Sequence, residues 1–99
     1  MRQIEQDARR AFLNNKEFKC SNTKVRIFDG KPHLYLHDNL IAKRDENNEL
    51  LIRHCGWETP TTMSRLNSLP GVAIRSYKGS FILNELGYMK DEWYNIDKL

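Results

Sequence analysis

The sequence has few cysteines and no long hydrophobic run. Its two cysteines, Cys20 and Cys55, form no Cys-x-x-Cys pair and are too sparse for a secreted disulfide scaffold, so we expect free, largely buried thiols. No hydrophobic run approaches the roughly 20 residues that span a bilayer, and the opening segment MRQIEQDARR is too polar for a signal peptide. These features predict a cytoplasmic protein without a membrane partner.

Catalytic and metal-binding patterns are also scarce. His33 and His37 lie in a strand-like segment, which would place their Cα atoms roughly 13 Å apart, too far to chelate one ion comfortably. His54 and Cys55 are sequence neighbours, and neighbours on a strand point to opposite faces. The sequence contains no Gly-rich phosphate loop, and its acidic residues lie in turn or tail contexts. We therefore predict no catalytic residue, no metal site and no cofactor, and we interpret the protein as a non-enzyme.

The composition is that of a small globular protein. Of its 99 residues, 39% are hydrophobic and 29% are charged, which predicts a single domain covering residues 1–99. The net charge is +3, but residues 1–44 hold ten Lys and Arg against five Asp and Glu, whereas residues 45–99 hold six against eight. A basic face in the first half could bind nucleic acid or an acidic protein, although an ordinary solvated surface is the alternative. The residues of this basic face are Arg9, Arg10, Lys16, Lys19, Lys24 and Arg26.

Periodicity predicts an α+β fold. Apolar residues at helical spacing indicate a helix from Arg2 to about Asn14, with its inward stripe formed by Ile4, Ala8, Ala11 and Phe12 and with Glu5, Arg9 and Arg10 elsewhere. Short alternating runs between turn residues then predict strands within residues 24–28, 33–37, 39–44 and 49–55, and a hairpin within residues 72–84. We expect the N-terminal helix and one short internal helix, residues 59–68, to pack on a small, mainly antiparallel sheet of five or six strands.

The segment GWETPTTMSRLNSL, residues 56–69, carries the most specific chemical signal. Thr59 can cap a helix and Pro60 suits its first position, so the next residues occupy the first turn. Free backbone N–H groups there favour an anion, and the hydroxyls of Thr61 and Thr62 with the guanidinium of Arg65 could complete a binding corner. The alternative is that Thr59 only caps the helix and the other side chains are surface polar residues.

Aromatic residues suggest a second possible surface. Trp57 could fill the joint between sheet and helix, which is the favoured interpretation, or it could present its ring for base stacking. Phe28, Tyr35, Tyr77 and Phe81 are explained by strand packing, but aromatics interleaved with Arg26, Arg53 and Arg75 on one sheet face would resemble a stacking platform.

The segments NTKV, LYLHDNLIA, CGWETPTT, SRLNSLPGV and a late ILN followed by Trp resemble an uncharacterised family of small tailed-bacteriophage proteins. The resemblance runs from Asn22 to Trp93, and its sharpest part is the G-W-x-T-x-T-T motif followed by R-L-N-x-L. It implies a phage-encoded protein in the host cytoplasm and supplies no activity. Two departures, Asp38 and the MKDEW segment, stand where the family has a Gly, which affects local turn geometry more than the fold.

We expect a phage accessory protein that acts by binding. The first candidate ligand is nucleic acid, held by the basic face and by the corner of Thr61, Thr62 and Arg65. The alternative is a protein-interaction module that inhibits or modulates a host protein. A small enzyme comes third.

Overall fold

The structure, a computed structural model, describes residues 2–99. Its helices are α1 (Gln3–Leu13), α2 (Pro60–Asn67) and the 3-10 turn η1 (Ile96–Lys98). Its strands are β1 (Phe18–Cys20), β2 (Thr23–Phe28), β3 (Lys31–Leu36), β4 (Asn39–Arg44), β5 (Leu50–Ile52), β6 (Ile74–Tyr77), β7 (Ser80–Leu83) and β8 (Tyr94–Asn95). Neither helix α1 nor helix α2 is long and apolar enough to cross a membrane.

The main sheet has six antiparallel strands in the order β1-β2-β3-β4-β5-β8. The first four strands lie side by side in the sheet in the same order as along the chain, because a two-residue turn joins each strand to the next. Asp29 and Gly30 form one such turn with φ of 51° and 72°, and His37 and Asp38 form another with φ of 50° and 64°. Asp38 therefore adopts the left-handed conformation that favours Gly and that Asp tolerates. The predicted α+β architecture is confirmed.

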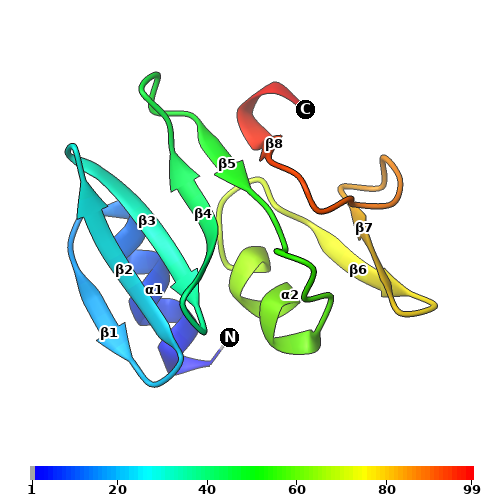
Figure 1. The fold of residues 1–99 in the computed structure, drawn as a ribbon, viewed down its shortest axis with the longest axis horizontal. Helices are drawn as coiled ribbons and strands as arrows, with labels where there is room; N and C mark the ends of the chain where they lie inside the picture. Colours follow the sequence, from blue (N-terminus) through cyan, green and yellow to red (C-terminus); the bar gives the residue numbers. More distant parts are fainter. Residues whose placement is uncertain (1) are drawn as a thin grey trace.

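Helix α1 packs across one face of β1, β2 and β3 (Figure 1). Ala8, Ala11 and Phe12 are buried there, as their helical spacing predicts. The rest of the predicted stripe is wrong, because Ile4 is only half-buried and Glu5 is buried instead. A carboxylate on the inward face of a helix needs a buried partner, which α2 provides.

Strands β6 and β7 form a separate two-stranded sheet at one end of the molecule (Figure 1), which confirms the predicted hairpin. On its outer edge, each strand has one residue whose backbone bonds to a side chain from the α2 segment. The Asn67 amide donates to the Ile74 carbonyl at 2.9 Å and accepts from the Ile74 N–H at 2.7 Å, as a neighbouring strand would. On the other side, the Glu58 carboxylate accepts from the Phe81 N–H at 2.7 Å. The segment before and within α2 therefore joins the hairpin to the main sheet.

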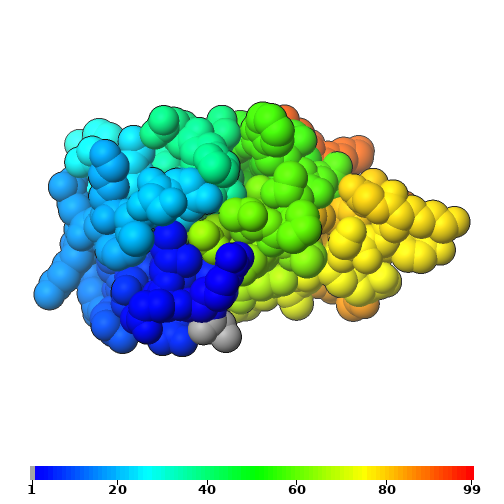
Figure 2. Space-filling view, turned by 90° about the horizontal axis from the view of Figure 1, so that it is seen from below, coloured from blue at the N-terminus to red at the C-terminus, as the bar shows by residue number. Residues whose placement is uncertain are grey.

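The main sheet has one covered face and one open face. Val25, Leu34 and Leu36 point toward α1 and are buried, whereas the side chains between them along β2 and β3 point away. In Figure 1 the open side of β1 to β4 faces the viewer, with α1 behind the strands. Figure 2, seen from below, shows α1 in dark blue along one side of these strands and no helix along the other.

Candidate functional site

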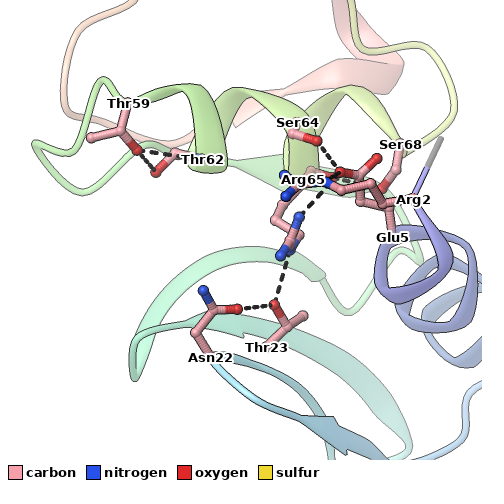
Figure 3. Close-up of polar contacts among 9 residues, drawn as sticks. All are labelled: Arg2, Glu5, Asn22, Thr23, Thr59, Thr62, Ser64, Arg65 and Ser68. Atoms are coloured by element: carbon pink, nitrogen blue, oxygen red, sulfur yellow. Dashed lines mark hydrogen bonds and ion pairs between the residues drawn. The ribbon is translucent and has the colours of Figure 1, made fainter.

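Arg65 of α2 is buried and fully engaged in the fold. Only 3% of the residue is exposed, and its side chain points away from the helix N-terminus, between α1 and β2 (Figure 3). The guanidinium Nε donates to the Thr23 hydroxyl at 2.9 Å, and Nη1 donates to the Glu5 carboxylate at 3.2 Å. Arg65 therefore links helix α2 to β2 and α1.

The Glu5 carboxylate collects three donors. Besides Arg65, it accepts a hydrogen bond from the Ser64 hydroxyl and one from Arg2 Nε at 3.1 Å. Burial alone would raise the pKa of Glu5, but the hydrogen bonds from Ser64 and Arg2, together with the charge of Arg65, hold this pKa below its ordinary value. Burial lowers the pKa of Arg65, and the charge of Glu5 opposes that effect. The pair is a buried, hydrogen-bonded salt bridge between two helices.

The start of α2 is capped as the sequence predicts. The Thr59 hydroxyl accepts from the Thr62 N–H at 3.2 Å and lies 3.1 Å from the Thr62 hydroxyl (Figure 3). Thr62 is buried, because Thr62, Arg65 and Leu66 form the inward face of the helix. Of the three residues of the predicted corner, only Thr61 remains partly accessible beside the helix start.

His54 and Cys55 follow β5, which ends at Ile52, so the expectation that they alternate on a strand is wrong. The His54 Nε2–H donates to the Met89 carbonyl at 3.1 Å, and Nδ1 accepts from the Gly56 N–H at 2.9 Å, which defines a neutral ring with both nitrogens in use. Cys55 Sγ donates to the Leu40 carbonyl, and burial raises the pKa of this thiol while Arg53 opposes the rise. Cys20, predicted to be buried, is exposed.

A pocket of about 510 Å³ lies between the start of α2 and the turn that joins β3 to β4. Buried Leu36, Ile41 and His54 line it, and Asn39, Thr61 and Trp57 add polar and aromatic groups. Trp57 is 58% exposed, so the interpretation that its ring fills the sheet–helix joint is wrong. We call this cavity the Trp57 pocket.

The open side of the sheet carries alternating cations and aromatic rings. Directly paired residues of antiparallel strands place their side chains on the same face, and Arg26 pairs with His33 while Lys24 pairs with Tyr35. The Lys24 ammonium lies 5.3 Å from the centre of the Tyr35 ring. We define the open sheet face by eight residues: Lys19, Lys24, Arg26, Phe28, Lys31, His33, Tyr35 and Lys43.

Phe28 is the most exposed ring of this face, at 52%, and it makes a T-shaped contact with the His33 ring at a centroid distance of 5.2 Å. Two of the cations have acidic neighbours at the rim. Lys24 lies 2.9 Å from Asp38, where its hydrogen bond lowers the pKa of that carboxyl, and Arg26 lies 3.7 Å from Glu17. Lys19, Lys31 and Lys43 have no salt-bridge partner within residues 2–99.

Trp93 extends the open sheet face toward β5. The Lys43 ammonium lies 4.6 Å and the Arg53 guanidinium 5.5 Å from the centre of its ring. Arg53 also pairs with Asp91 at 2.8 Å. Sequence reasoning did not connect Lys43 with Trp93, because only strand pairing and the packing of the late segment bring residues so distant in sequence together.

The residues predicted for the binding corner, the basic face and the stacking platform lie in five places. Lys24 and Arg26 are on the open sheet face, and Trp57 and Thr61 are at the Trp57 pocket, which Thr62 also lines. Arg65 is buried behind α2. Arg9 and Arg10 are exposed on α1, across the sheet from Lys24 and Arg26. Arg75 lies on the β6–β7 hairpin, where its Nε–H is shared between the two carboxylate oxygens of Glu85.

A family model described as Kyanoviridae Gp96 protein matches residues 1–99. Kyanoviridae is a phage family, so the match confirms the resemblance to phage proteins, and it does not by itself single out the Gly56–Leu69 segment. No curated protein and no solved structure matches the chain.

Proposed function

The chain belongs to the Kyanoviridae Gp96 protein family, a family of phage proteins, and we propose that it acts by binding nucleic acid on the open sheet face. On this proposal it is an accessory protein of the host cytoplasm that binds rather than catalyses. The observation that carries the proposal is a sheet with one face covered by α1 and the other lined by Lys, Arg and aromatic side chains. Sheets of this kind suit single strands, because bases stack on rings while cations contact phosphates.

The charges of the open sheet face support phosphate contacts. Lys19, Lys31 and Lys43 lie on three different strands, so together they cover the width of the face rather than one spot. Phe28 supplies an exposed ring that every base can stack on, and this favours binding with little sequence preference.

The test compares two pairs of basic residues on opposite sides of the sheet. Lys24→Ala/Arg26→Ala removes two cations from the open sheet face, and Arg9→Ala/Arg10→Ala removes two from α1 as the matched control. Binding of a single-stranded oligonucleotide is measured by fluorescence anisotropy across a salt series. We expect the first variant to bind more weakly and to lower the slope of log K against log salt by about 1 to 2, and the control to leave both unchanged.

A further variant tests stacking independently of charge. Phe28→Ala should weaken oligonucleotide binding by about 1–3 kcal/mol while leaving the salt slope as it is. The proposal is wrong if the protein binds neither single-stranded DNA nor RNA at low salt. It is also wrong if the α1 pair weakens binding as much as the open-face pair.

A second candidate function is protein binding by the β6–β7 hairpin. Tyr77, Leu86 and Tyr88 are exposed, and an antiparallel backbone bridge between Tyr88 and Ile82 holds the segment after β7 against the edge of that strand. Such exposed aromatics are enriched at protein interfaces. A host protein bound here would be recovered with the wild-type chain and lost with Tyr77→Ser/Tyr88→Ser, while oligonucleotide binding by the same variant would remain.

A further inference from the structure

Trp57 is the one large side chain of the Gly56–Leu69 segment that the fold leaves outside. Its backbone is well held, because its N–H donates to the His54 carbonyl at 2.9 Å and Gly56 supplies the positive φ of 80° that the turn requires. The ring is nevertheless 58% exposed, at the mouth of the pocket. A fixed backbone with an exposed indole is a preorganised surface for a flat ligand, because little freedom is lost on binding.

The Trp57 pocket has the size and the composition of a site for a planar ring. Its volume of about 510 Å³ falls within the range of small-molecule pockets, and Leu36 and Ile41 give it an apolar wall. At its rim, the Asn39 amide makes one long hydrogen bond of 3.4 Å to the His37 carbonyl. Within residues 2–99 neither the Asn39 Oδ1 atom nor the Thr61 hydroxyl has a hydrogen-bond partner.

These rim groups match the edge of a nucleobase. A side-chain amide offers a donor and an acceptor side by side, which is the pattern that base edges present, and a hydroxyl can serve either role. An aliphatic ligand would leave these groups without partners. A nucleobase would use both the stacking surface of Trp57 and the polar rim.

The pocket also adjoins the proposed nucleic-acid surface. His37 lines the Trp57 pocket and, equally, a polar hollow formed with Lys19, Lys24 and Asp38 at the ends of the β1–β2 and β3–β4 hairpins. We propose that the Trp57 pocket receives one unpaired base of a strand whose phosphates lie on the open sheet face. This inference rests on the proposed function, and it adds that the ligand is single-stranded, since a base inside a duplex cannot present its face and edge to a pocket.

The two tryptophans of the chain allow the pocket and the open sheet face to be observed separately. In Trp93→Phe the remaining indole reports on the pocket, and in Trp57→Phe it reports on the open sheet face. The probes are a short single-stranded oligonucleotide, an abasic oligomer of equal length and charge, and free adenosine and uridine. We expect the oligonucleotide to quench Trp57 emission in a saturable way and the abasic oligomer to bind without that quenching. Free nucleosides should shift the Trp57 indole N–H resonance at every salt concentration.

Trp57→Ala supplies the binding test. Since stacking on one ring contributes about 1–3 kcal/mol, the variant should bind the oligonucleotide roughly 5- to 150-fold more weakly, with its affinity for the abasic oligomer unchanged. Thr61→Val, which removes only the hydroxyl, should change the preference among bases rather than the salt dependence. Circular dichroism of each variant confirms that the exposed substitution leaves the fold intact.

These measurements distinguish a failure of the Trp57 pocket proposal from a failure of the proposed binding on the open sheet face. If Trp57→Ala binds the oligonucleotide as tightly as wild type does, the pocket receives no base, while the open sheet face stands. If no oligomer binds at low salt but nucleosides still shift the Trp57 resonance, the pocket binds bases and the open sheet face is wrong. If neither oligomers nor nucleosides bind, both proposals are overturned.

Discussion

Arg65 and Arg26 show how differently one residue type is used in two regions of this molecule. Arg65, in the α2 segment, is buried with its charge satisfied by Glu5 and Thr23. Arg26, on the open sheet face, is exposed and has a carboxylate 3.7 Å away at the rim. A buried guanidinium that bonds to two other elements holds them together, whereas an exposed one keeps donors for a ligand. The comparison therefore assigns Arg65 to folding, and it supports the proposed binding role of Arg26 and the open sheet face.

Among the variants that test this comparison, Arg65→Ala should show the largest change in stability. Arg65→Ala removes the buried cation from the Glu5 carboxylate and leaves only the largely exposed Arg2 beside it, so we expect the free energy of unfolding to fall by about 3–5 kcal/mol. Urea denaturation gives the value, and Arg10→Ala is the control, because Arg10 lies 3.9 Å from Asp7 in an exposed pair whose loss should cost under about 1 kcal/mol. Unchanged stability combined with lost oligonucleotide binding would break the comparison and return Arg65 to the binding site.

A smaller loss is expected at the edge of β6. Asn67→Ala removes both side-chain hydrogen bonds to the Ile74 backbone, and we expect destabilisation by about 1–3 kcal/mol because Ile74 is buried and its polar groups lose their partners. Amide hydrogen exchange at Ile74 should accelerate at the same time. Oligonucleotide binding by this variant should match wild type, and a selective loss of binding would contradict the structural role of Asn67.

The pH dependence of stability tests the same cluster. The pKa of Glu5 is held below its ordinary value of about 4.5, so the unfolded chain binds more protons than the folded one as the medium becomes acidic. The contribution of Glu5 is therefore complete above that ordinary value and is lost as the pH falls through the lowered folded pKa. The stability difference between wild type and Glu5→Gln should shrink over this acidic window and stay constant from pH 6 to 8, as measured by urea denaturation at each pH. A constant difference at all pH values would show that folding does not shift the pKa of Glu5.

The smallest expected effect on stability belongs to the open sheet face. Lys19→Ala and Lys31→Ala should each change the free energy of unfolding by under about 0.5 kcal/mol, because neither ammonium has an acidic or aromatic partner among the described residues. The same variants should weaken oligonucleotide binding. Destabilisation comparable to that of Asn67→Ala would mean that this face also maintains the fold.

Local sequence patterns predicted the elements of the fold well. Thr59 and Pro60 placed the start of α2, and the alternation around Leu34 and Leu36 identified the buried side of β3, because caps and strand periodicity depend on near neighbours. The burial of Glu5 could not be predicted in this way. Its partner Arg65 lies 60 residues away, and only the packing of α2 against α1 reveals that a charged position belongs to the inward stripe.

The candidate site was predicted only in part. Lys24 and Arg26 follow from the alternation along β2, but the predicted corner assumed that Arg65 turns toward the helix N-terminus. Arg65 and Leu66 lie on the same inward face of α2. Because Leu66 is buried in the core, Arg65 also points inward. The exposure of Trp57 depends on the turn at Gly56, which bonds to His54. The His54 ring is in turn held by the Met89 carbonyl, 35 residues away, so no local pattern reveals it.

The closed edges of the β6–β7 hairpin limit how any partner can approach it. Asn67 occupies the outer edge of β6 at Ile74, and Glu58 with the Met89 N–H occupies that of β7 at Phe81. An extended peptide that adds itself to a sheet needs a row of free backbone groups, and these contacts interrupt that row at Ile74 on β6 and at Phe81 on β7. The hairpin therefore resists both strand-by-strand self-association at high concentration and recognition by β-augmentation. A protein that uses this end of the molecule must read Tyr77 and Tyr88 by the shape of its own surface.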